Sequence, residues 1–306
     1  MKALLPLLAL LGLGLLGAGF LGRWWPPGDS LAVGRLWVMG GLVLIAPLAW
    51  RVGLRRLSVA VLLTLLMAAV PTGLAWRGAM GPGREAGTGA GAGAGAGLIL
   101  YQKNVNYRGG DRAALIADLR ASGADVVALQ ETVAADQAMF AALEDLYPTQ
   151  VHCRSSVVGD VAILARAPAV AGSAACSRHD NWATLRLELP GIGAVQVVSL
   201  HLAWPWPFSQ ALQLPGVVGA LTGMEGPVIV AGDFNMQPWG ASVAAVAATI
   251  GGQRLGGHGT TRVGWLPPPP VIIDHVLVPG GWGGTVTLRP LTGSDHRGLL
   301  ARITPP

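Results

Sequence analysis

Carboxylate, amide and imidazole side chains recur in this chain directly after short apolar runs that have the length of β-strands. These residues are Asn104, Glu131, His201, Asp233, Asn235, Asp274, Asp295 and His296. Each strand is followed by a loop, so residues that come directly after different strands can meet at one edge of a sheet. Taken singly, each also fits a plainer role, because Asp and Asn after a strand form turns or cap the next helix. Likewise, His201 fits a satisfied core histidine.

Gathered in one place, these side chains would suit the hydrolysis of a phosphodiester. In-line attack builds negative charge on the phosphate, and hard cations held by carboxylate oxygens neutralise that charge. Asn235, His201 and His296 could add donors to the phosphate. An Asp274–His296 pair would raise the imidazole pKa and fix its tautomer. No cysteine or clustered histidine pattern suits a tetrahedral zinc site, so an oxygen-ligated metal is preferred.

The order of the motifs carries more information than any one of them. In chain order they read Lys-Asn-Val (103–105), Leu-Gln-Glu-Thr (129–132), Ser-Leu-His-Leu (199–202), Gly-Asp-Phe-Asn (232–235), Ile-Asp-His-Val-Leu (273–277) and Gly-Ser-Asp-His-Arg (293–297). This series resembles the endonuclease/exonuclease/phosphatase superfamily, which includes pancreatic-type deoxyribonucleases, abasic-site endonucleases, neutral sphingomyelinases and inositol polyphosphate 5-phosphatases. The resemblance covers Leu98 to Ile303. It implies an α/β fold, a four-layer α/β sandwich of two mixed sheets with the site at one mouth between them.

The resemblance also implies a metal site. Glu131 would be the principal ligand of Mg²⁺ or Mn²⁺, with Asn104 close to the same ion. Asp295 would supply a further metal or supporting carboxylate. Lys103 departs from the pattern, since many relatives carry an aromatic residue before the Asn; it could contact a substrate phosphate or extend to solvent.

The remaining roles concern water and phosphate. By resemblance, Asp233 would orient and deprotonate the attacking water, and Asn235 would bond the scissile phosphate or that water. His296, held by Asp274, would contact the phosphate, and His201 would be a second phosphate-contacting histidine.

The first third of the chain has a different character. Three apolar stretches, 3–22, 36–50 and 57–76, predict three transmembrane helices in a membrane anchor over residues 1–76. A signal peptide is the competing interpretation of residues 1–22. Arg51, Arg55 and Arg56 lie in the loop before the third stretch and predict that this loop is cytoplasmic. The catalytic domain would then lie outside the cytoplasm, in the periplasm or cell exterior.

A Gly/Ala-rich stretch follows and predicts a flexible linker over residues 77–97, leaving 98–306 as the catalytic domain. The formal net charge of the chain is +5, but residues 1–97 hold eight of the 21 Lys and Arg and only two of the 16 Asp and Glu. The catalytic domain is therefore near neutral, which disfavours long nucleic acid. The expected substrate is a phospholipid headgroup or small phosphoester; a nuclease of extracytoplasmic DNA or RNA and a catalytically silent binding module are the alternatives. Besides substrate and lipid bilayer, no protein partner is inferred.

Alternating and periodic apolar patterns predict the elements of the domain. Expected strands are 98–104, 126–130, 160–165, 183–189, 195–200, 228–231, 271–278 and 298–303, and expected helices are 111–122, 133–146, 209–221 and 240–249. Cys153 and Cys176 flank one strand and could form a disulfide between neighbouring strands or remain two buried thiols. His275 follows Asp274 on a strand, so its side chain should face the opposite way.

Overall fold

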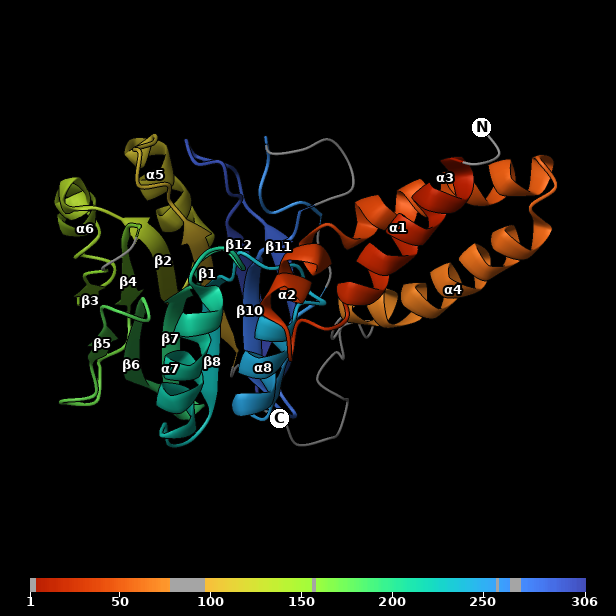
Figure 1. Ribbon diagram of the computed structural model, residues 1–306. Helices are drawn as coiled ribbons and strands as arrows, with labels where there is room; N and C mark the ends of the chain where they lie inside the picture. Colours follow the sequence, from red (N-terminus) through yellow and green to blue (C-terminus); the bar gives the residue numbers. More distant parts are fainter. Residues whose placement is uncertain (1–3, 78–96, 156–157, 257–258, 265–270) are drawn as a thin grey trace.

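Two mixed six-stranded sheets form the centre of the domain in this computed structural model, which describes residues 4–77, 97–155, 158–256, 259–264 and 271–306 (Figure 1). The first sheet has the order β11-β12-β1-β2-β4-β3. Its strands are β1 (Leu98–Asn104), β2 (Val126–Thr132), β3 (Thr149–Cys153), β4 (Asp160–Ala165), β11 (Gly283–Leu288) and β12 (Leu299–Thr304). The β1–β2 pair is parallel, and the other pairings in this sheet are antiparallel.

The second sheet has the order β5-β6-β7-β8-β10-β9, with β7–β8 as its parallel pair. Its strands are β5 (Ala175–Ser177), β6 (Trp182–Leu189), β7 (Gly193–His201), β8 (Val228–Asp233), β9 (Gly252–Arg254) and β10 (Asp274–Pro279). Inward-facing residues of both sheets, such as Leu100, Ile163, Leu185 and Val197, make one apolar core between them. The sheets therefore pack face to face, as period-2 alternation dictates.

Helices cover both outer faces. The first sheet carries α5 (Arg112–Ser122), the 3₁₀ turn η1 (Ala134–Asp136) and α6 (Gln137–Ala141), and the second carries α7 (Gln210–Thr222) and α8 (Ala241–Thr249). The predicted α/β sandwich of two mixed sheets is confirmed. The Asp111 carboxylate caps α5 by accepting from the Ala114 amide at 2.9 Å, and Gly123 ends it in the left-handed conformation.

The single helix expected over 133–146 is wrong. The structure has only η1 and the five-residue α6 there, because the Asp136 carboxylate turns back to the Val133 amide and to Arg112. Four strands carried too little periodic signal to be predicted, namely β3, β5, β9 and β11, and all four lie at sheet edges.

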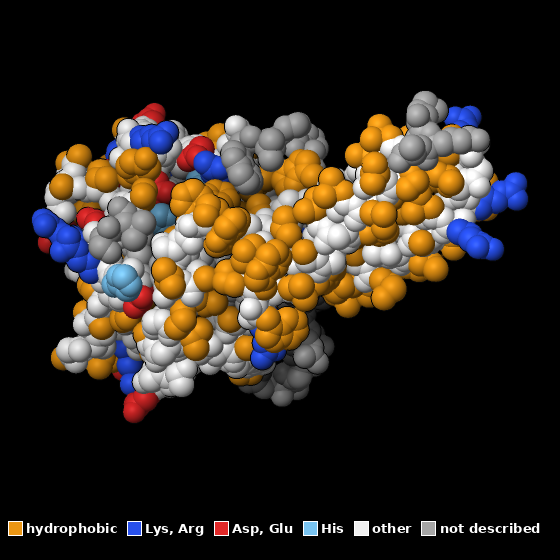
Figure 2. All heavy atoms as spheres, viewed as in Figure 1, with side chains coloured by type: hydrophobic (Ala, Val, Ile, Leu, Met, Phe, Trp, Pro, Cys, Tyr) orange, Lys and Arg blue, Asp and Glu red, His pale blue; other side chains and the backbone are white. Residues whose placement is uncertain are grey.

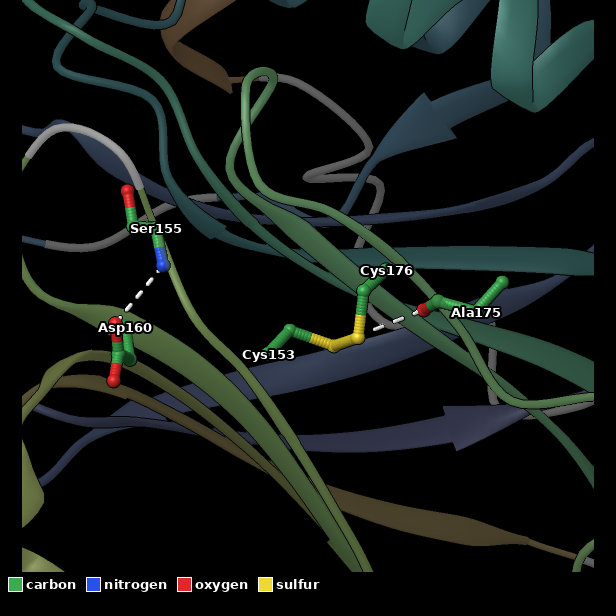
Figure 3. Close-up of a disulfide and its surroundings, with 5 residues drawn as sticks. All are labelled: Cys153, Ser155, Asp160, Ala175 and Cys176. Carbon is green, nitrogen blue, oxygen red and sulfur yellow. Dashed lines mark hydrogen bonds between the residues drawn. A yellow bond between two sulfur atoms is a disulfide. The ribbon is translucent and has the colours of Figure 1, made fainter.

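Cys153 and Cys176 form a disulfide (Figure 3). Cys153 ends the edge strand β3 of the first sheet, and Cys176 lies in the edge strand β5 of the second. The bond therefore joins the two sheets at one side of the sandwich, rather than neighbouring strands of one sheet.

Loss of this disulfide is expected to lower the free energy of unfolding by about 3 kcal/mol, since it closes a loop of intermediate length. Thermal unfolding of the full chain, followed with and without reductant, measures the effect. The Cys153→Ser/Cys176→Ser double variant should match the reduced protein, and an unchanged midpoint in both would contradict the expectation.

The N-terminal third is helical. It comprises α1 (Leu4–Ala18), α2 (Pro26–Val33), α3 (Arg35–Arg51) and α4 (Arg55–Arg77). Of the described helices, only α4 is long and apolar enough to cross a membrane alone, while α2 and α3 pass the same test only as a pair bent by 64°. The prediction of three full transmembrane helices is therefore wrong. Helix α1 ends at Ala18, with Gly19 and Gly22 in the connection that follows, and Pro26 and Pro27 begin α2, so the first apolar stretch forms a helix of only 15 residues.

Helices α1, α3 and α4 pack together through a small apolar core that includes Ala9, Leu42 and Val61. They extend away from the sandwich in Figure 1, and their outward faces expose large side chains such as Leu10 and Met67. The predicted linker, 77–97, lies almost wholly outside the described residues.

Candidate active site

The polar residues that the motifs single out lie around one cavity of about 500 Å³ at the ends of β1, β2, β7 and β8. Its lining includes Glu131, His201, Asp233, Asn235, Asp295 and His296. Asn104 and Asp274 do not line the cavity but bond directly to residues that do. The eight predicted site residues are thus brought together from both sheets.

Asn104 joins two carboxylates at the cavity floor. Its Nδ2 lies 2.9 Å from Glu131 Oε1 and 2.9 Å from Asp233 Oδ2, so it donates to both. Its Oδ1 accepts from the Asn106 amide at 2.9 Å. His201 Nε2 approaches the same pair, at 3.7 Å from Glu131 and 3.9 Å from Asp233. Asn104 therefore holds the two carboxylates in place at the cavity floor.

Glu131 stands on an irregular stretch of β2. The β2–β4 register shifts between Gln130 and Thr132, and Glu131 has a positive φ of 59°. A β-bulge of this kind redirects a side chain at the end of a strand. Gly159 makes the bend possible, because a Cβ there would lie 2.3 Å from the Glu131 Cα. The chain thus holds Glu131 in an uncommon backbone conformation that aims its carboxylate into the cavity.

A second cluster lies beside the first and is more deeply buried. His296 Nδ1 is 2.9 Å from Asp274 Oδ2, and His296 Nε2 is 3.7 Å from Asp233 Oδ2. Gln102 Nε2 donates to the other Asp274 oxygen at 3.0 Å. The imidazole therefore bridges a buried carboxylate and the carboxylate at the cavity floor.

Burial and charge set the protonation states of this cluster. Burial raises the pKa of Asp233 to about 6, helped by Asp274 and opposed by the two histidines. Burial works against a charged His296, but the carboxylates of Asp274 and Asp233 outweigh it and raise the pKa of His296 to about 9. The pKa of Asp274 is lowered, because His296 and hydrogen bonds overcome its burial. Near pH 7, His296 is therefore cationic and Asp233 is an ionised base.

Asn235 lies at the mouth of the cavity, two residues after Asp233. Its backbone amide donates to Asp233 Oδ1 at 2.8 Å, and its Nδ2 donates to the Leu202 carbonyl at 2.8 Å. Like Glu131, it has a positive φ, here 48°. Asparagine tolerates this conformation better than most residues, which suits a tight turn after β8.

Asp295 lines the cavity but joins neither acidic cluster. Its carboxylate bonds Arg262 at 3.1 Å and Asn106 Nδ2 at 3.1 Å. Arg262 also lines the cavity. The structure therefore places Asp295 where it holds the Arg262 guanidinium beside the cavity.

Two neighbouring residues face away from the cavity. Lys103 is fully buried, and its Nζ donates to the Pro290 and His296 carbonyls at 3.0 and 2.9 Å. Neither expectation for Lys103, phosphate contact or solvent exposure, describes it; it ties β1 to the loop that carries His296. His275 is buried against Phe234 and bonds the Met236 carbonyl, on the opposite face to Asp274 as predicted.

Three supporting residues were missed from the sequence. Asn181 Nδ2 donates to His201 Nδ1 at 3.2 Å and leaves Nε2 directed at the carboxylates. Gln102 holds Asp274, and Arg262 holds Asp295. Gln102 could have been found, because it lies two residues before Asn104 and so shares its face of β1. Asn181 lies in a turn and Arg262 in an isolated β-bridge to His296, and neither segment carries a comparable sequence signal.

The donor chemistry fits a hard divalent cation. Glu131, His201 and Asp233 each offer a ligand atom within 4.8 Å of the others, and Asp233, Asp274 and His296 form a second such group. Carboxylate oxygens at the cavity floor suit Mg²⁺ or Mn²⁺, and His296 is already occupied as a partner of Asp274. The residues nearest such an ion would be Glu131 and Asp233.

Comparison with known proteins agrees with this geometry. A sequence profile of the Endonuclease/Exonuclease/phosphatase family matches residues 101–296. Among solved structures, an endonuclease/exonuclease/phosphatase from Beutenbergia cavernae is 18% identical with a TM-score of 0.54, covering 68% of this chain and 72% of its own. One from Bacteroides vulgatus is 13% identical with a TM-score of 0.55, covering 69% and 100%.

The chain is also similar to D. rerio TDP2 complexed with single-strand DNA product, at 19% identity and a TM-score of 0.53, covering 69% and 100%. No curated protein sequence matches the chain. At these identities the solved structures show the fold, while the profile match spans well over half of the chain. From Tyr101 to His296, around the cavity just described, this chain belongs to the endonuclease/exonuclease/phosphatase family.

Proposed function

We propose that the chain is a metal-dependent hydrolase that cleaves phosphodiester bonds by direct attack of water. The observation that carries the proposal is the buried arrangement of an ionised base, Asp233, between two imidazoles and beside the carboxylate of Glu131. No cysteine is placed to act as a nucleophile, because both are joined in the disulfide on the side of the sandwich. The proposal assigns the attack to a water molecule beside the base Asp233.

Each side chain has a separate task in this reaction. Asp233 accepts the proton of the attacking water, and Asn104 and Asn235 hold its carboxylate in orientation. His296, kept cationic by Asp274, donates to a phosphate oxygen on which negative charge grows. His201, set in its tautomer by Asn181, contributes a second donor beside Asp233. Arg262 and Arg108 line the outer cavity, where a substrate phosphate would enter.

A bound Mg²⁺ or Mn²⁺ would supply the positive charge that this acidic floor needs. Glu131 would hold it with its carboxylate, and Asp233 would share the ion's neighbourhood. The nearness of the Glu131 and Asp233 carboxylates, which share Asn104 and His201 as neighbours, supports this assignment, because two close carboxylates repel each other and a cation offsets that repulsion.

The helical N-terminal third is proposed to hold the enzyme at a membrane. Support comes from α4, which is long and apolar enough to span, and from the large side chains exposed on the outward faces of α1, α3 and α4. The turn between α3 and α4, which Arg51, Arg55 and Arg56 flank, lies at the end of this bundle away from the sandwich in Figure 1 and fits a cytoplasmic side. Figure 2 shows Lys and Arg side chains at that end. The disulfide fits an oxidising, extracytoplasmic location for the catalytic domain.

The proposed substrate is a phospholipid or small phosphodiester. The near-neutral catalytic domain supports it, because long nucleic acid requires many Lys and Arg contacts to its backbone. A nuclease is the second candidate, favoured by the similarity in fold to TDP2 that was solved with single-strand DNA product.

Removal of divalent metal is the direct test of the proposed function. The full chain in detergent is expected to hydrolyse bis-p-nitrophenyl phosphate with Mg²⁺ or Mn²⁺, and to lose that activity with excess chelator. Added Mg²⁺ or Mn²⁺ should restore it. Hydrolysis that continues in chelator would remove the metal from the proposal, and no hydrolysis under any condition would favour a catalytically silent module.

The two shifted pKa values predict a bell-shaped dependence of rate on pH. The base Asp233 must be ionised, so the rate should rise with pH through about 6. His296 must be protonated, so the rate should fall through about 9. In Asp274→Asn the imidazole loses its main partner, and the upper limb should move to lower pH. A kcat profile measured between pH 4.5 and 10 tests this, and an upper limb that stays in place would exclude His296 as its origin.

A further inference from the structure

The large apolar side chains that the described part of the catalytic domain exposes are gathered at one place. They are Tyr107, Val158, Trp206, Phe208 and Leu212. Tyr107, Val158 and Phe208 line the cavity itself. Trp206 is 54% exposed in the β7–α7 loop, and Leu212 is 79% exposed in the first turn of α7. The mouth of the active site therefore carries an apolar rim of Trp206, Phe208 and Leu212, and no large apolar side chain outside this group of five is exposed in the described part of the domain.

The helical N-terminal third is docked on the same domain through buried polar contacts. The Asp29 carboxylate in α2 accepts from the Ala241 amide at 2.8 Å and the Ser242 amide at 3.3 Å. It thus caps the N-terminus of α8, where a carboxylate is favoured. Trp239 Nε1 donates to the Ala32 carbonyl at 2.7 Å. Helix α2 is therefore joined to the segment that follows Asp233 and Asn235.

Helix α4 is held to the catalytic domain at its C-terminal end. The Arg254 guanidinium, buried in β9, donates to the Ala75 and Trp76 carbonyls at 3.2 and 2.8 Å. A cation at the C-terminus of a helix satisfies its last carbonyls and its dipole. Trp76 also stacks on Trp239, with ring centroids 6.0 Å apart. With both α2 and α4 bound, the catalytic domain has a fixed orientation relative to the helices.

These contacts between the helices and the catalytic domain place the apolar rim beside the end of the helical bundle that carries exposed tryptophans. Trp24 and Trp25, 75% and 47% exposed, lie between α1 and α2, and tryptophan favours the boundary between hydrocarbon and headgroups. The Ser30 hydroxyl in α2 donates to the backbone carbonyl of Trp206. Figure 2 shows hydrophobic side chains continuing from the front of the catalytic domain, across α2, to the surface of the bundle.

We infer that the docked helices hold the mouth of the active site against the bilayer that anchors the chain, and that the substrate is a lipid phosphodiester whose apolar part stays in that bilayer. The inference rests on the proposed function and adds the source of the substrate. The Trp206–Leu212 rim and the tryptophans at 24 and 25 share one lipid surface. The phosphate of a lipid at that surface can enter the cavity, where Arg262 and the acidic floor meet it.

Full-length protein reconstituted into vesicles tests the inference. The vesicles contain phosphatidylcholine, phosphatidylethanolamine and phosphatidylglycerol in equal parts, and bis-p-nitrophenyl phosphate serves as the water-soluble comparison. Trp206→Ser/Leu212→Ser alters two exposed side chains that do not line the cavity. It is expected to lower lipid hydrolysis about tenfold, since interfacial affinity scales with buried apolar area, and to leave hydrolysis of the soluble ester unchanged. The Ser30 contact goes to the Trp206 backbone and survives the change.

The outcomes separate this inference from the proposed function. Equal lipid hydrolysis by the double variant and wild type overturns the inference, as does a wild type that cleaves the soluble ester or single-stranded DNA but no vesicle lipid. A wild type inactive on all three with Mg²⁺ or Mn²⁺ overturns the proposed function itself. A loss of both lipid and soluble activity in the double variant also overturns the inference, because the rim would then support the cavity rather than meet lipid.

Discussion

Replacing Asp233 by Asn is expected to lower kcat for bis-p-nitrophenyl phosphate by about 10²–10⁴-fold, the usual contribution of a positioned general base. The Asp233 carboxylate is only 1% exposed, and its neighbours hold it at the cavity floor. Asn has the same shape but cannot accept the water proton at neutral pH. The variant should stay folded, because it removes a buried charge and keeps the side-chain volume.

Asp145→Asn is the matched control for that change. Asp145 pairs with Arg120 on the surface and its side chain is 63% exposed, so its loss should leave kcat within twofold of wild type. Steady-state rates and thermal unfolding of both variants complete the comparison. Wild-type kcat in Asp233→Asn would assign the base to another group.

Glu131→Gln is expected to have the next largest effect, a loss of about 10²–10³-fold in rate at a fixed Mg²⁺ concentration. Its amide keeps the volume at the bulge in β2 but removes the negative charge that would hold the cation. Binding of Mn²⁺, measured directly by electron paramagnetic resonance, should weaken in parallel. Higher metal concentration should recover part of the rate.

Glu144→Gln makes the same chemical change at an exposed position away from the cavity and should retain both rate and metal binding. If Glu131→Gln bound Mn²⁺ as tightly as wild type, the cation would have to be placed elsewhere among the carboxylates. Equal rates in Glu131→Gln and wild type would support a role as a binding module.

The strands that carry the site could be predicted because their apolar runs are continuous and their motifs follow in a diagnostic order. The expected limits of β1 and β4 agree with the structure, and Asp233, Asp274 and His296 meet as the resemblance implied. Edge strands such as β3 and β5 escaped detection, because few of their residues face the core. The disulfide between them depends on how the two sheets stack, which no local pattern contains.

The sequence also did not predict the roles of residues whose contacts are distant along the chain. Asp295 was expected as a metal ligand or a supporting carboxylate, and its pairing with Arg262 could not be read from the sequence. Lys103 was assigned to phosphate or solvent, although strand alternation turns it away from Asn104 and onto the loop before β12. Three apolar stretches suggested three spans, whereas turn-forming glycines and prolines divide the first two differently. In each case tertiary contacts decide the outcome.

The division of the site between the two sheets has a mechanical consequence. Asn104 and Glu131 belong to one sheet and His201, Asp233 and Asp274 to the other, so the Asn104–Asp233 and His201–Glu131 contacts cross between the two sheets. Between the same sheets Gln130 bonds Ser199, and Gln102 reaches Asp274. These hydrogen bonds from the two amides fix the position of one sheet relative to the other. Substitutions in the apolar core between the sheets could shift one sheet relative to the other by tenths of an ångström. Such a shift would abolish activity while the protein remains folded.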